Sequence, residues 1–254
     1  MISSIKLAPF FRDFIQQSEY ENNGFFQDMH IHTPASDGFI KIEFLKQFLE
    51  DKKYLIAITD HNAIAGNLAL FQSGISVIPG LELGCQDGFE LLVYFKTHDA
   101  LVEFYEREVR PYQNVFRMAK TNRHIFEYLE ILKEYSCHLS IPHIAGYMQK
   151  NFLENKTYIY ELISMVDSLE IHNHSLSEAK NKKASYLQEK YQKFATFGSD
   201  AHSVTDLKRF YDICNQRETQ FSKVVSSLWK AGSLAGIGEK HLMHFVMSYK
   251  NIIS

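Results

Sequence analysis

Short apolar runs alternate with longer segments of helical periodicity along the chain, and this alternation limits the possible folds more than any other property. The runs that predict buried strands are 25–32, 55–61, 75–83, 90–95, 137–143, 168–173 and 194–202. The segments that predict helices are 40–54, 98–135 with a break near Pro111, 175–191, and 205–254 with an interruption around 232–238. Strands that alternate with helices predict an α/β fold with a largely parallel sheet.

This sheet is predicted to close into a barrel. An open doubly wound sheet normally carries a glycine-rich turn for a dinucleotide, and the sequence has no GxGxxG motif. The chain has 254 residues, 45% of them hydrophobic, without a low-complexity linker or a repeat, which predicts one domain over residues 1–254. The segment from about 205 to 254, which contains Trp229, is predicted to pack on the barrel as an amphipathic cover.

Composition excludes several classes of protein. The formal net charge is -3 with both signs interspersed, so no global basic field indicates nucleic-acid binding. Cys85, Cys137 and Cys214 lie far apart, which favours free thiols in a reducing compartment over a disulfide framework. The sequence shows no signal peptide and no apolar run near the ~18 residues that a membrane span needs. These features predict a soluble, cytoplasmic protein with no membrane partner.

Residues able to bind metals stand at the ends of most predicted strands. They are His30, His32, Asp37, Asp60, His61, Glu82, His143, Asp200 and His202. The carboxyl ends of the strands of a parallel barrel meet at one face, so these side chains are expected to converge there. In HIH and SDAH the paired residues are two apart, which places both side chains on the same side of a strand. Imidazole and carboxylate ligands without cysteine suit zinc, manganese or iron.

Five motifs in this order, HIHTPASDG, ITDHN, PGLELG, IPH and GSDAH, resemble those of the PHP (polymerase and histidinol phosphatase) superfamily. The resemblance covers about residues 26–203. It implies a distorted (β/α)7 barrel of the TIM type with a trinuclear metal centre and phosphoesterase activity.

The resemblance also implies the role of each ligand. His30, His32 and Asp200 would bind the first metal, and Glu82 would bridge it to the second, which His143 serves. The third metal would be held by Asp37, His61 and His202. Asp60 would orient a ligand from behind.

One position departs from the motifs of the superfamily. Many members have a histidine at the start of the strand after the bridging glutamate, where this chain reads ELLVYF and has Glu90. A carboxylate still serves as a ligand, so Glu90 is included in the predicted site. The exchange makes the centre more anionic, which favours manganese or magnesium. Two or three divalent metals per chain are expected, drawn from manganese, zinc, iron and magnesium.

Such a centre predicts hydrolysis by metal-bound hydroxide without a side-chain nucleophile. Cys85, close to Glu82, is interpreted as a buried structural thiol because no base is dedicated to it. The SDG of the first motif resembles the branch that contains polymerase-associated PHP domains, nucleoside bisphosphate phosphatases and 5′-to-3′ exonucleases. The predicted substrates are therefore phosphomonoesters or phosphodiesters of nucleotides or short oligonucleotides.

Further residues carry weaker predictions. The basic run Arg107, Arg110, Arg117, Lys120 and Arg123 fits either phosphate contact, with Arg123 as the predicted contact, or a solvated face interleaved with glutamates. Glu170 and Asn173 match a Glu–x–x–Asn pattern of the superfamily and are predicted to contact substrate or to orient ligands. The remaining histidines are interpreted as incidental, structural or surface residues: His98, His124, His138, His172, His174, His241 and His244.

Two other functions stay open. Metal-dependent amidohydrolases, which attack C–N bonds, also place histidine and aspartate at the strand ends of barrels. They commonly use a bridging lysine at a strand end, which the predicted strands lack. A PHP scaffold without catalysis would be expected to lack ligands, whereas this chain keeps a potential ligand at every position. The oligomeric state is not predicted.

Overall fold

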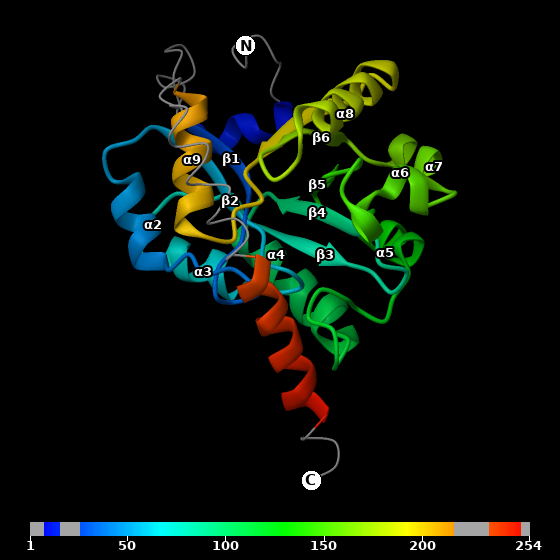
Figure 1. Cartoon of the computed structure of the whole chain (residues 1–254), viewed down its shortest axis with the longest axis horizontal. Helices are drawn as coiled ribbons and strands as arrows, with labels where there is room; N and C mark the ends of the chain where they lie inside the picture. The colour runs from blue at the N-terminus through cyan, green and yellow to red at the C-terminus, as the bar shows by residue number, and fades with distance from the viewer. Residues whose placement is uncertain (1–7, 16–25, 216–233, 250–254) are drawn as a thin grey trace.

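A computed structural model describes residues 8–15, 26–215 and 234–249 of the chain (Figure 1). Within them the strands are β1 (Phe26–Ile31), β2 (Tyr54–Ile58), β3 (Gly80–Gly84), β4 (Glu90–Phe95), β5 (Cys137–Ile141), β6 (Ser168–Asn173) and β7 (Phe194–Gly198). The helices are α2 (Ile42–Leu49), α3 (Ala65–Gln72), α4 (His98–Phe104), α5 (Ile125–Leu132), α6 (Phe152–Asn155), α7 (Ile159–Met165), α8 (Glu178–Lys190) and α9 (Val204–Cys214). Shorter helical turns are η2 (Pro9–Phe14), η3 (Tyr105–Val109), η4 (Arg110–Tyr112) and η5 (Met148–Lys150). Residues 234–249 are also helical.

The strands form a mixed α/β fold with two sheets and not a closed barrel. β1 and β2 form a parallel pair, and the larger sheet has the order β3-β4-β5-β6-β7. Isolated parallel bridges join Ile31 to Ala201 on one side and Ala57 to Ile78 on the other. Single bridges replace continuous ladders at both junctions, so the described strands curve around a common interior without a complete hydrogen-bonded ring. The prediction of a (β/α)7 barrel is therefore not confirmed, because the described strands form only an incomplete ring.

One strand runs against the predicted parallel direction. β4 is antiparallel to both β3 and β5, whereas β5, β6 and β7 run parallel to one another. Only residues 85–89 separate β3 from β4, and a parallel connection needs a crossover of roughly a dozen residues or more. Because β4 is reversed, its first residue, Glu90, lies at the face where the neighbouring strands end, opposite Gly84.

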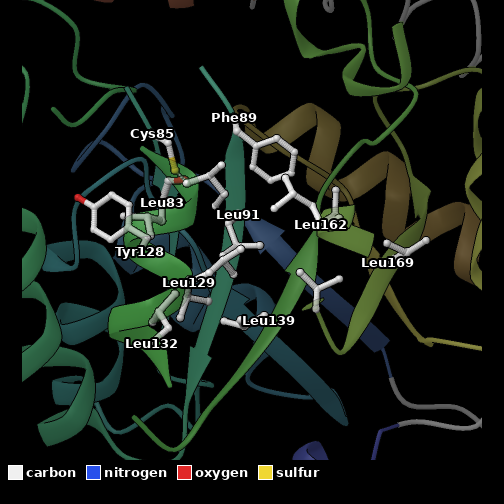
Figure 2. Close-up of a cluster of buried hydrophobic side chains, with 14 of the residues drawn as sticks. Leu83, Cys85, Phe89, Leu91, Tyr128, Leu129, Leu132, Leu139, Leu162 and Leu169 are labelled. Atoms are coloured by element: carbon white, nitrogen blue, oxygen red, sulfur yellow. Dashed lines mark hydrogen bonds between the residues drawn. The ribbon is translucent and has the colours of Figure 1, made fainter. Parts of the chain in front are cut away.

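Three apolar clusters hold the sheets and helices together. The largest lies between β3–β5 and α5, and Figure 2 shows Tyr128, Leu129 and Leu132 of α5 facing Leu83 and Leu91. A second cluster joins β1 and β2 to the helices α2, α3 and α9, which lie beside this pair in Figure 1. The third fills the interior between the two sheets with side chains of β1, β2 and β4, and the fully buried Phe11 of η2 caps it; the strand residues are Met29, Leu55, Ala57, Leu92 and Tyr94.

The cysteine interpreted as structural lies in the largest cluster. Cys85 is fully buried beside Leu83, as Figure 2 shows. Burial raises the pKa of its thiol well above the usual value, so the thiolate needed for nucleophilic chemistry is suppressed.

Helices start where side chains satisfy the free N–H groups of their first turns. At α9, Ser203 accepts from the Asp206 N–H while the Asp206 side chain accepts from the Ser203 N–H. At α5, His124 and Glu127 make the same reciprocal arrangement, which explains one of the histidines outside the motifs. Burial of the apolar face of each helix then fixes its position on the sheet.

The structure confirms the helix predictions only in part. The break near Pro111 is confirmed, because η4 carries this proline in its first turn. Periodicity does not predict α3, α6 and α7. The interruption expected at 232–238 is wrong for 234–238, which are helical, and Trp229 lies outside the described residues.

No helix among the described residues is long and apolar enough to cross a membrane.

Candidate metal centre

The structure brings all the predicted metal ligands to one place. His30 and His32 come from the end of β1, His61 follows β2, and Glu82 lies within β3. The others come from the start of β4, from the turns after β5 and β7, and from the loop after β1: Glu90, His143, Asp200, His202 and Asp37. All of these side chains are buried or nearly so. Residues that span more than two thirds of the chain therefore share a single site.

Glu82 occupies the centre of the site. One of its oxygens, Oε2, lies 3.3 Å from both His30 Nε2 and His32 Nε2, and 3.0 Å from His61 Nδ1. Its other oxygen, Oε1, lies 3.0 Å from His143 Nε2. Four imidazoles thus face one carboxylate, which is the arrangement expected of a residue that bridges two metals.

Three groups of side chains have their ligand atoms close enough to hold an ion. These groups are His30, His32 and Glu82; His61, Glu82 and Glu90; and His32, Asp37, His61 and His202, with the atoms of each group all within 4.8 Å of one another. Asp200 Oδ1 lies 3.6 Å from His30 Nε2 and 3.5 Å from His32 Nε2, beside the first group. The grouping resembles the ligand sets that the sequence motifs imply, and the ligand roles remain predictions.

Glu90 reaches the site because β4 is antiparallel. Its carboxylate lies 3.4 Å from His143 Nε2 and 4.0 Å from His61 Nδ1. It also lies 3.1 Å from the ammonium of Lys150, a residue of η5 that the sequence motifs do not single out. The glutamate that replaces the usual histidine thus has a cationic neighbour that balances its charge.

The site concentrates opposite charges out of water. Burial opposes ionisation of the imidazoles, but Asp200, Glu82 and Asp37 raise the pKa of His32 to about 10. Burial likewise opposes ionisation of the carboxylates, yet His61 and His30 hold the pKa of Glu82 well below its usual value. His61 and His202 do the same for the pKa of Asp37. The carboxylates therefore require positive charge beside them, which protons or metal ions supply.

Unpaired polar atoms indicate that metals fit this set of residues. Eight buried atoms in the site make no hydrogen bond: His30 Nε2, both ring nitrogens of His32, His61 Nδ1, Glu82 Oε2, Glu90 Oε2, His143 Nδ1 and Asp200 Oδ1. A buried polar atom without a partner costs about 1–3 kcal/mol. All of them except His143 Nδ1 lie within 4.0 Å of a donor atom of another site residue, and together they form the set of nitrogen and oxygen donors that manganese, zinc and iron accept.

Glu170 and Asn173 lie behind the ligands. Glu170 accepts a hydrogen bond from His30 Nδ1 at 3.0 Å and from the His143 backbone N–H at 2.8 Å. The Asn173 amide donates to Glu170 at 2.9 Å and lies 3.4 Å from Asp200. Both are fully buried and outside the lining of the cavity, so this placement supports the ligand-orienting alternative over substrate contact.

Asp60 orders the loop that follows β1. Its carboxylate accepts hydrogen bonds from the backbone N–H of Thr33 at 2.7 Å, from the Thr33 hydroxyl at 2.6 Å and from the Ser36 hydroxyl at 2.7 Å. Gly66 packs against this carboxylate so closely that any side chain there would collide with it. Asp60 therefore fixes the loop that presents Asp37.

The turns that carry the ligands have unusual backbone conformations. His143 and Asp200 have φ of 29° and 52°, and Asn62, directly after His61, has φ of 47°. Such left-handed conformations are rare outside glycine and are kept where the surroundings hold them. At these three positions the strands stop and turn, which aims the side chains inward.

The prediction for Arg123 does not match its surroundings. Its guanidinium pairs with Glu108 and lies over the ring of Tyr112, 3.4 Å from the ring centroid. It is not among the residues that line the cavity of the site.

The sequence motifs do not indicate the place of His241, which is interpreted from the sequence as a structural or surface residue. Its Nε2 lies 3.0 Å from Asp37 Oδ2, so the helical residues 234–249 reach the metal centre. No spacing in the sequence links two residues that are 204 positions apart. Lys150 was missed for a similar reason, because it lies in an irregular turn beyond the IPH motif.

A cavity of about 300 Å³ opens over the centre. Six of the nine predicted ligands line it together with Tyr147, Lys150, His174, Ser175, Arg209 and His241. Its basic side chains and the imidazoles beneath them suit an anionic ligand of small size.

Solved structures share this arrangement of elements. A protein from Bifidobacterium adolescentis assigned as a metal-dependent phosphoesterase matches with a TM-score of 0.56 and 15% identity, over 72% of this chain and 89% of that chain. A two-domain protein from Bacteroides vulgatus with a predicted PHP-like phosphoesterase matches with a TM-score of 0.52 and 14% identity, over 76% of this chain and 56% of that chain. The lesion-specific endonuclease Q of Pyrococcus furiosus matches with a TM-score of 0.53 and 18% identity, over 70% and 48%.

An amidohydrolase from Chromobacterium violaceum with bound sulfate also shares the fold, with a TM-score of 0.51 and 14% identity over 70% of this chain and 88% of that chain. No family model and no curated protein sequence matches the chain. Fold and site together define a mixed α/β protein in which an incomplete ring of strands carries a buried cluster of histidines and carboxylates that could hold metal ions. It shares its fold with the PHP-like protein and with the other solved structures named above, as expected from the resemblance of the sequence motifs.

Proposed function

We propose that this protein is a metal-dependent phosphoesterase that hydrolyses phosphomonoesters or phosphodiesters of nucleotides or short oligonucleotides. The observation that carries the proposal is the set of three ligand groups, each pair of which shares one residue (His32, His61 or Glu82), with several ligand atoms that have no hydrogen-bond partner. Two or three divalent ions fit these groups, with manganese, zinc, iron and magnesium as candidates. All nine ligand positions are filled, which weighs against a scaffold that has lost catalysis.

The side chains divide the work of such a centre. When bound, the metals supply an activated water and positive charge for the phosphate oxygens. Glu170 holds the ring of His30 by its Nδ1, which leaves Nε2 directed at Glu82. Lys150, with its side chain 42% exposed, and Arg209 line the cavity and place positive charge where a phosphate would lie. Their role in the proposed reaction is to bind and orient the phosphate.

Nucleic acid is supported as the substrate class by a neighbour of the same fold. An endonuclease Q was solved with a 27-mer duplex that carries an abasic lesion at its active site, and it matches with a TM-score of 0.54 and 18% identity. This chain spans about half of that protein, 49% of its length, so the likeness supports a nucleotide ligand and leaves its form open.

A second candidate function is the hydrolysis of a C–N bond, which the amidohydrolase neighbour favours. The predicted strands offer no bridging lysine, but the structure places Lys150 of η5 at the site. Its ammonium pairs with Glu90 at 3.1 Å, and a lysine held as an ammonium has no lone pair with which to bridge metals. The phosphoesterase is therefore preferred.

Phosphate release tests the proposal directly. The manganese-reconstituted protein is assayed with a nucleoside 3′,5′-bisphosphate, a 5′-phosphorylated oligonucleotide, histidinol phosphate and p-nitrophenyl phosphate, with His30→Ala as the control. We expect release from a nucleotide compound that the variant abolishes. No release from any compound by a metal-loaded protein would contradict the proposal, and hydrolysis of amide or lactam substrates would then support the second candidate.

A further inference from the structure

Two members of the basic run differ from the others in their surroundings. Arg107 pairs with Glu103 at 2.9 Å and Arg110 pairs with Glu106 at 2.7 Å, and all four side chains are exposed. Arg123 pairs with Glu108. In contrast, Arg117 and Lys120 make no ion pair among the described residues. Pairing with the interleaved glutamates therefore accounts for three members of the run and leaves two without an anionic partner among the described residues.

These two cations line a groove beside the metal centre. The groove has a volume of about 440 Å³. We call it the basic groove, and its walls are Gly88, Phe116, Arg117, Lys120, Gln149 and Phe245. It continues into the cavity over the metal centre, because four residues line both spaces: Glu90, Ala119, Lys150 and His241. A chain that enters the cavity has a path along the groove.

The loop that carries the two cations is fixed to the metal centre. Asn62, directly after the ligand His61, donates a hydrogen bond from its side chain to the Met118 carbonyl at 2.9 Å. Gln113 donates from its side chain to the Asn62 carbonyl at 2.6 Å, and the Thr121 N–H and hydroxyl both donate to the Gly84 carbonyl. The loop is thereby held at a set position relative to the metal ligands.

Glycine at position 84 permits this approach. A side chain there would collide with the Ala119 carbonyl, so only glycine lets the loop lie against β3. Within the loop, the Asn114 side chain accepts from the Phe116 N–H at 3.0 Å and the Arg117 N–H at 3.1 Å, which closes a tight turn. Arg117 and Phe116 are therefore presented by a closed turn and not by an open loop.

The groove concentrates positive charge without a matching anion. A Cβ atom at Gly88 would lie 3.1 Å from the Lys120 ammonium and 3.9 Å from that of Lys156. The hydrogen bond that Lys120 makes within the described residues is long, 3.4 Å to the Gln86 carbonyl. Partial burial and the positive charges of Arg117 and Lys156 lower its pKa. The carboxylates nearby, Glu90 and Asp87, are already paired with Lys150 and Lys156.

Aromatic side chains stand beside the cations. The rings of Phe116 and Phe245 lie 5.5 Å apart at 45° to each other, and Phe245 is 48% exposed although it is large and apolar. Phe245 belongs to the same helical residues 234–249 that bring His241 to Asp37. Cations that follow a phosphate backbone together with rings on which bases stack are the chemistry of single-stranded nucleic-acid binding.

We infer that the basic groove binds the single-stranded nucleic acid next to the scissile phosphate, with Arg117 and Lys120 on flanking phosphates and Phe116 and Phe245 against a base. This inference rests on the proposed function and deepens it, because it makes an oligonucleotide strand, and not a mononucleotide, the preferred substrate. Duplex fits less well, since paired and stacked bases do not expose their faces to the rings.

A pair of matched double variants tests the inference. Arg117→Ala/Lys120→Ala removes two charges from the groove, and Arg107→Ala/Arg110→Ala removes two from the same run outside it. With manganese-loaded protein and a 5′-phosphorylated single strand of about ten nucleotides, we expect the groove variant to raise KM on the order of 10-fold. Its hydrolysis of p-nitrophenyl phosphate is expected to stay unchanged, and the control variant is expected to match the wild type on both substrates.

Salt dependence and strand form sharpen the test. Each phosphate contact on a single strand contributes about 0.7 to the slope of log affinity against log salt, so the groove variant is expected to lose about 1.4 of that slope. Phe116→Ala is expected to weaken the single strand and to leave the slope unchanged. Equal KM values for both double variants, no preference of the wild type for the longer strand, or a preference for duplex would each overturn the inference.

The two proposals fail in different ways. If the protein releases phosphate from small esters but ignores strand length, the groove inference fails and the phosphoesterase stands. If it hydrolyses nothing, the phosphoesterase fails, and fluorescence anisotropy then measures binding of the intact oligonucleotide by the manganese-loaded protein. Equal binding by the wild type and the groove variant would overturn the inference in that case also.

Discussion

Strand β5 carries a buried histidine near each of its ends, and the two lie in opposite surroundings. His138, near the start, is 4% exposed and packs against the rings of Phe10, Phe11 and Tyr94, at centroid distances of 5.3, 4.7 and 6.4 Å. Its Nε2 forms a hydrogen bond of 2.9 Å with the Ser168 hydroxyl. We call this region the aromatic end. His143, just past the other end, is 2% exposed and faces Glu82 and Glu90.

The pKa values of His138 and His32 are shifted in opposite directions in the two regions. At the aromatic end, burial lowers the pKa of His138 to about 4. In the metal centre burial acts in the same sense, but Asp200 and Glu82 overcome it and raise the pKa of His32 to about 10. Equal burial therefore has opposite outcomes, and the number of adjacent carboxylates decides between a neutral structural histidine and one that requires a cation.

The largest effect is expected when the central carboxylate, Glu82, is removed, because this change takes away what distinguishes the metal centre from the aromatic end. Glu82→Gln keeps the shape of the side chain but removes the charge that His30, His32 and His61 face. We expect loss of bound metal and a fall in phosphoesterase activity on the order of 10³-fold, because a metal supplies several kcal/mol to the transition state. Mass spectrometric metal analysis and phosphate release measure both. Glu130→Gln, exposed and paired with Lys133, is the matched control.

A full complement of metal in Glu82→Gln would show that the remaining histidines and carboxylates hold the ions without Glu82. The carboxylate would then not be what separates the two regions.

A smaller effect is expected at Glu170, which lies behind the ligand His30. Glu170→Gln weakens the acceptor that fixes the ring of His30, so the affinity for manganese is expected to fall roughly 10- to 100-fold, with activity recovered at saturating metal. A manganese titration of activity measures this affinity. An unchanged affinity with a raised KM for substrate would instead support the substrate-contact prediction for Glu170.

Much of the candidate site can be predicted from the sequence, because the apolar runs indicate where most strands end. Apolar runs locate β1, β2, β5 and β7, and polar side chains at the carboxyl ends of parallel strands must meet. The reversal of β4 does not follow from its apolar run, which carries no direction. The signal was the short connection 85–89, which is too short for a crossover. Glu90 was nevertheless placed correctly at the start of its strand.

Other parts of the site depend on tertiary packing. His241 reaches Asp37 from a helix whose position relative to the sheets no periodicity encodes. Lys150 and the loop with Arg117 are placed by turns, by Asn62 and by the absence of a side chain at Gly84. The basic run looks uniform in sequence, and only the pairing of individual side chains separates Arg117 and Lys120 from the rest.

The smallest expected effect lies at the aromatic end and depends on pH. Because the native pKa of His138 is about 4 and the usual value is 6.5, the unfolded chain binds this proton first as pH falls. The neutral His138 therefore contributes its full stabilisation of the folded state above pH 6.5, and this stabilisation is lost as pH falls toward 4. Between about pH 7 and about pH 5 this loss is about 2 kcal/mol of unfolding free energy.

His138→Gln keeps an amide for Ser168 but does not titrate, so urea unfolding with a chelator at both pH values is expected to show a decrease in unfolding free energy that is smaller by this amount. Since the metal centre is the same in both proteins, its own titration cancels in the difference. An equal decrease in both would mean that His138 is protonated in the native protein, and that the aromatic end resembles the metal centre after all.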